Sequence, residues 1–195
     1  MKLVEEKSPN VYVIGVDRGF ATFGVAVFEL LEDAERVVQV DVLETKKSPK
    51  KLATLASSDN HRRNQELYTG LRELLSYYPV YAAAAESTSL PRNSRAAYLI
   101  GRSDATWAGL LFEKEIPLAE LSPQAIKKRL CGRSNATKAE IQRELERWYP
   151  GQFDEFKGAY AKGKWEHGFD AAAALVACLP GDIMLMARKM LINKV

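Results

Sequence analysis

The feature that most constrains the fold is a pair of apolar, β-branched segments between Val11 and Phe28, joined by a turn that contains Gly19. Val, Ile and Phe favour strands, and a glycine among small residues favours a reversal of the chain. The first segment, Val11–Val16, is almost wholly apolar, which is typical of a strand in the interior of a sheet. The sequence therefore predicts a β-hairpin whose first strand is central.

Asp17 stands where this first strand ends. A carboxylate at that place must be paired, hydrogen-bonded or bound to a metal, because an uncompensated buried charge is very costly. The other interpretation is a turn aspartate that hydrogen-bonds its own loop. Glu86 repeats the pattern: it ends the apolar run Val80–Ala85, bounded by Pro79 and by a turn-like segment. The four alanines favour a helix by propensity, but the short run after a helix favours a buried parallel strand, and we predict the strand.

The rest of the chain alternates between helical and strand patterns, so an α/β fold is expected. After the hairpin, the sequence predicts a third strand over 36–43, a helix over 60–77 capped by Asn60, and a helix over 92–113 opened by Pro91. A strand over 118–121 follows, then a helix starting at Ser122–Pro123 and a helix over 138–148 with Thr137 and Glu140 in a capping box. The chain ends with an irregular stretch over 152–164 and a last helix over 166–191 that is broken at Pro180–Gly181.

The segment 44–59 is rich in Lys, Ser and Thr and predicts an exposed, mobile loop. Its four lysines are Lys46, Lys47, Lys50 and Lys51. Such a cluster is either a solvated surface or a phosphate-contacting loop. The first ten residues are a polar lead-in.

Length and composition favour one domain over residues 1–195, with a net charge of +3 that permits nucleic acid as a partner. The two cysteines, Cys131 and Cys178, are too few for a disulfide framework, so a reducing cytoplasm is expected, in a bacterial cell or in the host of a virus. No run of about 18 apolar residues occurs, so no membrane partner is predicted.

His167 and Asp170 are spaced i and i+3, so they share one face of the last predicted helix. The alanines that follow allow this helix to lie close to a sheet, near Asp17 and Glu86. Taken singly, His167 could be a surface or capping residue and Asp170 a dipole-favoured acid. Three carboxylates and one imidazole at a sheet edge suit divalent cations. Two such ions about 3.5–4 Å apart activate water and stabilise the leaving oxygen in phosphodiester hydrolysis.

The order of elements resembles the ribonuclease H-like fold, with a five-stranded mixed sheet in which a three-stranded antiparallel meander joins two parallel strands. The residues resemble the RuvC-type Holliday junction resolvases over roughly 11–179. The motifs that carry the resemblance are IGVDRGFATFG at 14–24, AES at 85–87, Asn93 with Gly101–Arg102, QAIK at 124–127 followed by Lys138, and HGFDAAAAL at 167–175.

The resemblance implies a homodimeric endonuclease that cuts two opposed strands of a four-way DNA junction symmetrically, with two Mg²⁺ or Mn²⁺ ions in each active site. Asp17, Glu86 and Asp170 match the family's metal-binding carboxylates, and His167 matches a position that holds an acid or a histidine. Glu166 is a rival ligand, because it stands four residues before Asp170. Lys127 and Lys138 match basic residues near the DNA backbone and the scissile phosphate.

Basic residues between Glu86 and Asp170 predict a DNA-binding face, whose affinity should fall steeply with salt. They are Arg92, Arg95, Arg102, Lys127, Lys128, Arg129, Arg133 and Lys138. The small-residue face of helix 92–113 is the predicted dimer interface. His61 has no predicted role.

Three features depart from the family pattern. Arg18 replaces the usual proline, which predicts either a phosphate contact or a surface charge. Ser89 and Leu90 stand where the family often has base-wedging aromatics, so only a modest apolar wedge at Leu90 and a weaker cut-site preference are expected. The 44–59 loop is longer than usual.

Three other functions remain open. The first is a ribonuclease H-like nuclease acting on RNA or on other branched DNA, which backbone contacts cannot distinguish from a resolvase. The second is a junction-binding scaffold without catalysis. The third is an actin-like ATPase, for which 195 residues leave little room.

Overall fold

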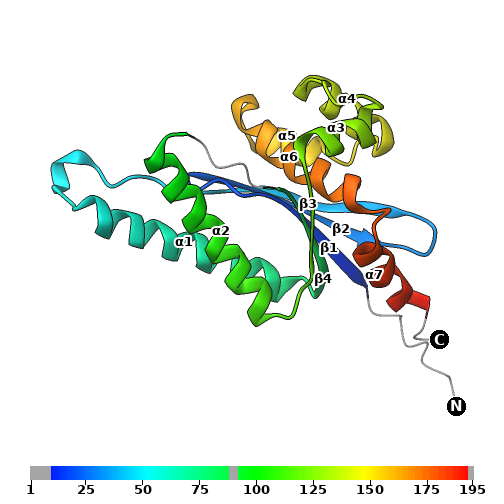
Figure 1. Cartoon of the computed structure of the whole chain (residues 1–195), viewed down its shortest axis with the longest axis horizontal. Coiled ribbons are helices and arrows are strands. Elements are labelled where there is room, and N and C mark those ends of the chain that lie inside the picture. Colours follow the sequence, from blue (N-terminus) through cyan, green and yellow to red (C-terminus); the bar gives the residue numbers. More distant parts are fainter. Residues whose placement is uncertain (1–9, 88–91, 193–195) are drawn as a thin grey trace, which may run out of the picture.

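The computed structural model describes residues 10–87 and 92–192, which form one five-stranded sheet flanked by helices (Figure 1). The strands are β1 (Val11–Asp17), β2 (Thr22–Leu30), β3 (Glu35–Glu44), β4 (Val80–Glu86) and β5 (Leu118–Leu121). The helices are η1 (Lys50–Leu52, a 3₁₀ turn), α1 (Ala56–Tyr77), α2 (Ser94–Glu113), α3 (Pro123–Cys131), α4 (Lys138–Trp148), α5 (Asp154–Ala159), α6 (Lys162–Cys178) and α7 (Asp182–Ile192).

The strand order is β3-β2-β1-β4-β5, so β1 lies at the centre of the sheet, as its apolar sequence predicts. β1 pairs antiparallel with β2, and β2 pairs antiparallel with β3, which makes the predicted meander. β4 pairs parallel with β1 on one side and with β5 on the other. The run Ala82–Ala85 is completely buried within β4, because helices cover both faces of the sheet there. The predicted mixed sheet is confirmed.

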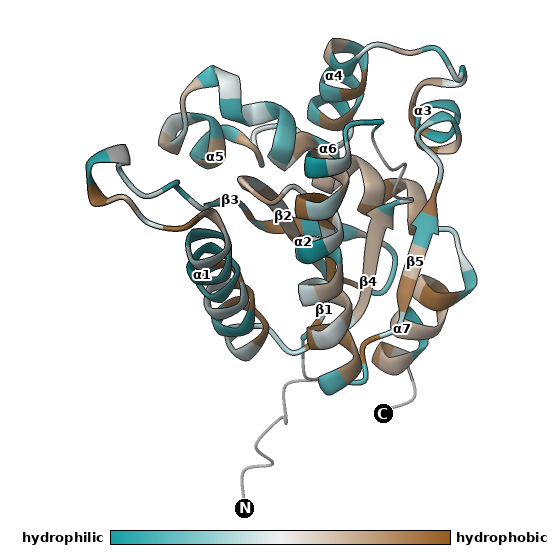
Figure 2. Cartoon of the chain, turned by 60° about the vertical axis from the view of Figure 1, so that its left-hand side comes forward, coloured by the Kyte–Doolittle hydropathy of each residue, from teal (hydrophilic) through white to brown (hydrophobic). Residues whose placement is uncertain are grey.

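Each face of the sheet carries its own apolar core. α1 and α2 cover one face, where Ile14, Val16 and Phe23 pack with Leu67, Leu71 and Trp107. The second face is covered by α6, with α3, α4 and α5 around it (Figures 1 and 2). Successive side chains of β1 point to opposite faces of the sheet, and both faces are covered by an apolar layer. This explains why the sequence of β1 has no polar face.

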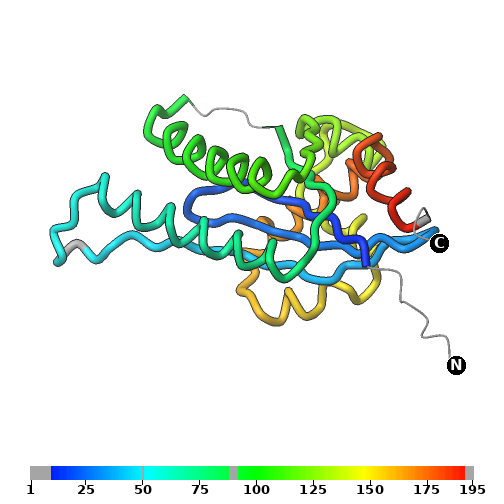
Figure 3. Tube along the Cα trace, turned by 90° about the horizontal axis from the view of Figure 1, so that it is seen from below, coloured from blue at the N-terminus to red at the C-terminus, as the bar shows by residue number. Residues whose placement is uncertain are grey.

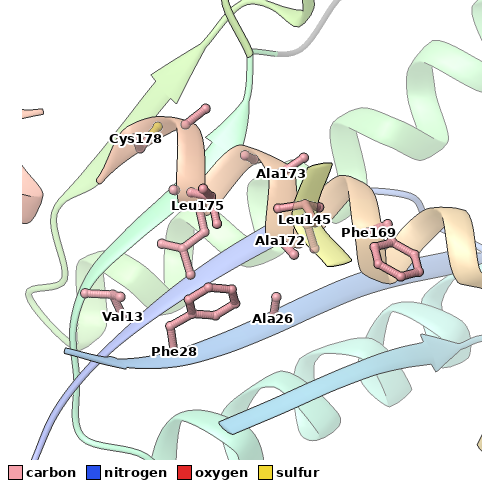
Figure 4. Packing of buried hydrophobic residues seen from close by; sticks show 14 of the residues in the cluster. Val13, Ala26, Phe28, Leu145, Phe169, Ala172, Ala173, Leu175 and Cys178 are labelled. Atoms are coloured by element: carbon pink, nitrogen blue, oxygen red, sulfur yellow. The ribbon is translucent and has the colours of Figure 1, made fainter. Parts of the chain in front are cut away.

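α6 lies close to β1 and β2, and small residues on both sides, among them Ala26, Ala172 and Ala173, take part in the contact beside larger side chains such as Phe28 and Leu175 (Figure 4). A Cβ atom on Gly15 would overlap the main-chain oxygen of Ala171. A Cβ atom on Gly24 would overlap the main-chain oxygen of His167. These two glycines therefore set the distance between the helix and the sheet, Gly24 at the turn of α6 that carries His167 and Gly15 at Ala171, one turn further along.

Several predicted element boundaries are wrong. α1 begins at Ala56 and not at Asn60, with Leu55 at its N-cap position and no side-chain cap. The stretch predicted as irregular contains α5, which two buried aromatic side chains, Phe153 and Phe156, anchor to the core. α6 begins at Lys162, one turn earlier than predicted.

Other predicted details are confirmed. The last helix breaks at Pro180–Gly181 into α6 and α7, and the capping box of Thr137 and Glu140 is present at the start of α4. α2 begins at Ser94 and not at Arg92 as predicted, and Asn93, for which no cap was predicted, accepts hydrogen bonds from two main-chain amides at its N-cap position. The predictions for Pro91, Ser89 and Leu90 lie outside the described residues.

The connection between β3 and α1 projects beyond one end of the sheet, at the left of Figures 1 and 3. Lys46, Lys47 and Lys51 are exposed on it, as predicted. Asp59 in the first turn of α1 accepts hydrogen bonds from the hydroxyl and amide of Ser48, which with Arg62 lower the pKa of Asp59 to about 2. The connection is thus tied to the first turns of α1.

Among the helices that the structure describes, none is by itself long and apolar enough to cross a membrane. By length and composition alone, the pair formed by α6 and α7 passes such a test, with a bend of 82° between the two helices.

Candidate active site

Asp17 and Glu86 lie side by side at one edge of the sheet. They are the last residues of β1 and β4, which are neighbouring parallel strands with Val16 opposite Ala85. Because parallel strands end at the same edge, the two carboxylates face the same region. This is the arrangement that the sequence predicts from two apolar strands that each end in an acid.

His167 reaches this edge from α6. Its Nδ1 atom lies 2.7 Å from Oδ2 of Asp17. The close packing of α6 on Gly24 places His167 at the end of β1, 150 residues away in sequence. The hydrogen bond to Asp17 raises the pKa of His167 above its ordinary value, although burial opposes this. His167 and Asp17 therefore form a pair.

Asp170 stands three residues further along α6 and pairs with Lys138 at the start of α4. Nζ of Lys138 donates a hydrogen bond to Oδ2 of Asp170 at 2.8 Å and another to Oε2 of Glu166 at 3.3 Å. Burial lowers the pKa of Lys138, but the hydrogen bond to Asp170 and the charges of both carboxylates outweigh it, so the pKa is raised. Lys138 is therefore a cation inside the carboxylate cluster.

Burial and the charges of neighbouring acids raise the pKa values of two of the carboxylates, Glu86 and Asp170. Burial raises the pKa of Glu86, and the charges of Asp170 and Asp17 raise it further. Burial also raises the pKa of Asp170, against the opposing effect of Lys138. Each raised pKa reflects a carboxylate whose charge is incompletely compensated, and a bound cation would supply that compensation.

The donor set fits a divalent cation, and two of its members make close contacts within the protein. Among residues 10–87 and 92–192, no three His, Cys, Asp or Glu side chains are arranged to hold a metal ion. Asp17 is held by His167, and Asp170 is held by Lys138. Three oxygen donors and one imidazole are the ligand types that Mg²⁺ and Mn²⁺ accept. A metal would therefore compete with these two pairs for the same oxygens.

The predicted DNA-binding residues are spread over α2, α3 and the start of α4. The charge of Lys127 acts on Glu86, so Lys127 lies near the carboxylates together with Lys138. Arg102 donates a hydrogen bond to the hydroxyl of Tyr98, and Arg133 pairs with Glu140. Arg129 donates to the main-chain oxygen of Ala177. The exposed members of the set are Arg92, Arg95, Lys128, Arg129, Arg133 and Lys138.

Arg18 corrects a sequence-based prediction. It is neither a surface charge nor free to contact a phosphate, because only 8% of its side chain is exposed and Asp104 and Glu120 both pair with it. The sequence contains no local sign of this, since the two partners lie 86 and 102 residues further along the chain. Gly24 lies in the 14–24 motif, but no pattern in the sequence predicts its contact with α6.

Comparison of the sequence with known proteins finds relatives from one family. The family model described as "Crossover junction endodeoxyribonuclease RuvC" matches residues 13–148. The RuvC of Polynucleobacter necessarius subsp. necessarius (strain STIR1) is 28% identical over 134 residues, which cover 69% of this chain and 73% of that protein. The RuvC of Roseiflexus sp. (strain RS-1) is 31% identical over 129 residues, which cover 66% of this chain and 71% of that protein.

Solved structures agree on the fold. The structure of Thermus thermophilus RuvC has a TM-score of 0.66 at 17% identity, and the match covers 87% of this chain and 95% of that one. A second structure of the same protein, in complex with a Holliday junction substrate, has a TM-score of 0.64 at 21% identity over 84% of this chain and 91% of that one. The match of the family model over more than half of the chain, on a sheet whose edge carries the expected acids, shows that this chain belongs to the RuvC family of crossover junction endodeoxyribonucleases.

Proposed function

We propose that this protein resolves four-way DNA junctions by symmetric, metal-dependent phosphodiester hydrolysis. The observation that carries the proposal is the meeting of Asp17, Glu86 and Asp170 at one sheet edge, beside the cation Lys138. Its relatives are named crossover junction endodeoxyribonucleases, and the Thermus relative was solved with a junction substrate. We propose in addition that residues 1–195 act as one nuclease domain, in the cytoplasm that holds the DNA.

Nucleases of this family depend on divalent metal ions. Asp17, Glu86, His167 and Asp170 would hold Mg²⁺ or Mn²⁺, and two bound ions supply activation of water and stabilisation of the leaving oxygen. The chain's own part is to place the carboxylates at the ends of rigid strands and a packed helix. Lys138, which donates a hydrogen bond to Asp170 beside the carboxylates, would contact a phosphate oxygen of the DNA, for which a flexible ammonium is suited.

Cleavage of a labelled four-way junction tests the proposal against its rivals. The controls are duplex DNA, single-stranded DNA, a branched three-way DNA and an RNA–DNA hybrid, each with Mg²⁺, Mn²⁺ or EDTA. Paired, ligatable nicks in the junction alone, abolished by EDTA, are the expected result. Cutting confined to another substrate would make the protein a related nuclease with a different substrate. Tight junction binding without cutting under either metal would make it a scaffold.

His167→Asp is expected to raise Mg²⁺-supported cleavage relative to Mn²⁺-supported cleavage. An imidazole nitrogen favours Mn²⁺ over Mg²⁺, whereas a carboxylate oxygen suits both ions. His167 must also be neutral to bind a metal, and Asp17 raises its pKa above the ordinary value, so wild-type activity should fall as the pH drops through that raised pKa, with a smaller fall in the variant. The ratio of initial rates in the two metals, measured from pH 6 to 8.5, checks both points. An unchanged ratio would remove His167 from the ligand set.

We propose that the active form is a homodimer joined through α2. The residues Gly101, Ala105, Ala108 and Phe112 are exposed on this helix at i, i+4, i+7 and i+11, and Phe112 is 88% exposed. Such a stripe lets two helices approach closely, and two-fold symmetry matches two symmetric cuts in a four-way junction. Ala105→Arg is expected to halve the mass found by analytical ultracentrifugation and to uncouple the paired nicks, whereas Ala139→Arg on α4 should do neither. A wild-type chain that sediments as a 21.8 kDa monomer at micromolar concentration would contradict this.

A further inference from the structure

Arg18 directly follows Asp17, and its guanidinium is enclosed by protein, with 8% of the side chain exposed. A guanidinium buried to this degree must have partners, because an unpaired buried charge is strongly destabilising. Its two terminal nitrogens find them on three different elements of the fold. Arg18, which directly follows a candidate metal ligand, is therefore held by three elements of the fold at once.

The partners of the guanidinium connect the strand ends. Nη1 donates to Oδ1 of Asp104 on α2 at 2.5 Å. Nη2 donates to Oε1 of Glu120 on β5 at 2.7 Å. Nη2 also donates to the main-chain oxygen of Glu86 at 2.5 Å, so the residue after one carboxylate ligand holds the backbone of another.

The main chain of Arg18 is fixed as well. Its carbonyl oxygen accepts a hydrogen bond at 2.9 Å from the hydroxyl of Ser103, a residue of α2 that is completely buried. The amide of Gly19 donates to the carbonyl of Asp17 at 3.0 Å, which closes the turn around Arg18. The turn that presents Asp17 is thus tied to α2 through Ser103 and Asp104.

We propose that Arg18 is a positioning residue that holds Asp17 and Glu86 at a fixed separation, and thereby sets the metal affinity of the active site. The inference rests on the proposed function insofar as these two carboxylates bind the metal. Like charges at the ends of two neighbouring strands repel each other. Asp17 pairs with Gly24 of β2 and Glu86 with Leu121 of β5, but the pairing of β1 with β4 ends at Val16 and Ala85, so it does not join the two acids to each other. A planar guanidinium with donors in a rigid fork bridges both strand ends, which a flexible ammonium cannot do equally well.

The experiment uses the full-length chain and three variants: Arg18→Met, Arg18→Lys and the control Arg36→Met. Arg36 pairs with Glu29 near the opposite end of the sheet, so the control removes the same charge far from the carboxylates. The first measurement is direct Mn²⁺ binding, followed by the electron paramagnetic resonance signal of free Mn²⁺. The second is junction binding at several salt concentrations without metal. The third is the metal dependence of cleavage.

Arg18→Met is expected to weaken Mn²⁺ binding by roughly 10-fold or more, the range seen when groups that orient metal ligands are removed. Cleavage should recover toward the wild-type rate when the metal is raised to saturation. Arg18→Lys should be intermediate, and Arg36→Met should match the wild type. Junction affinity and its salt dependence should not change in any of the three, because the buried guanidinium has no access to phosphate.

Two outcomes would overturn the inference. One is an Arg18→Met protein with normal Mn²⁺ affinity, even if its thermal stability is lower, since Arg18 would then be structural only. The other is weaker junction binding with a salt slope reduced by about 0.9, which is the mark of a lost phosphate contact. If Arg18→Met does not fold, Asp104→Asn removes one of its partners and should shift Mn²⁺ affinity in the same direction, and normal affinity there would equally overturn it.

The same experiment separates this inference from the proposed function. If Arg18→Met binds Mn²⁺ more weakly than the wild type, but the wild type cuts no four-way junction, the proposed function is refuted and the role of Arg18 stands. Junction cleavage with no dependence of Mn²⁺ affinity on Arg18 would do the reverse.

Discussion

Asp17→Asn is expected to reduce junction cleavage by at least about a thousandfold, while junction binding stays unchanged or improves. The substitution keeps the shape of the side chain and its contact with His167, but removes the charge that would hold the metal. A metal ion contributes several kcal/mol of transition-state stabilisation, and each 1.36 kcal/mol corresponds to about tenfold in rate. Binding is spared because losing a negative charge cannot weaken the attraction of DNA phosphates.

Single-turnover cleavage and fluorescence anisotropy, measured on the same junction, check this expectation. Asp33→Asn is the matched control: it makes the same chemical change in the exposed turn between β2 and β3, at the opposite end of the sheet from Asp17. It should leave both measurements unchanged. Asp17→Asn that still cuts within about tenfold of the wild type would mean that Asp17 is only a turn residue and that the candidate active site is wrongly assigned.

Gly24→Ala is expected to lower cleavage by about 100-fold and to destabilise the fold, although the substitution adds one methyl group. The added Cβ would overlap the main-chain oxygen of His167, so the nearby turns of α6 must move away from β2. One of these turns carries His167, and Asp170 follows His167 by three residues on the same helix. Displacement of a reacting group by about 1 Å can cost roughly 100-fold in rate, and overpacking of a core typically costs about 1–3 kcal/mol.

Gly163→Ala is the matched control for this prediction, because it makes the same substitution near the start of the same helix. A Cβ atom on Gly163 has no other atom within 4 Å. Alanine also favours a helix over glycine by up to about 1 kcal/mol, so this variant should be as active as the wild type and equally or more stable. Urea unfolding and cleavage rates measure both effects. Equal activity of Gly24→Ala and Gly163→Ala would show that the close approach of α6 is not needed for catalysis.

The two variants at the sheet edge and the variants of Arg18 test different properties of one site. Asp17 supplies a ligand, Gly24 sets the position of α6, and Arg18 restrains the two strand ends. Loss of activity that metal cannot rescue is expected for Asp17→Asn, whereas rescue at high metal is expected for Arg18→Met. This contrast assigns each residue its role without relying on the size of the effect.

Local patterns were sufficient to predict most of the secondary structure. The hairpin of β1 and β2, the parallel strand β4 and the break at Pro180–Gly181 depend on residues that are neighbours in sequence, and all three are confirmed. The predictions failed where a tertiary contact overrides local preference. α5 forms because Phe153 and Phe156 are buried against the core, and α1 begins earlier than predicted, with Asp59 bonded to Ser48 in its first turn.

The candidate site divides in the same way. Asp17 and Glu86 could be predicted because an acid that ends an apolar strand is visible in the sequence, and the spacing of His167 and Asp170 shows that they share a helix face. The partners of these side chains within the protein could not be predicted. Lys138 pairs with Asp170 across 32 residues, and the bonds of Arg18 span 68 to 102 residues.

The sequence by itself therefore determined all five strands, most of the helices and which acids stand at strand ends. Only the tertiary structure decided that Arg18 is buried and bonded to the end of β4, and that Gly24 sets the position of α6. The physical reason is that strand and helix patterns are short-range, whereas the partners of a buried charge and the space beside a glycine are set by the packing of elements that lie far apart in the chain.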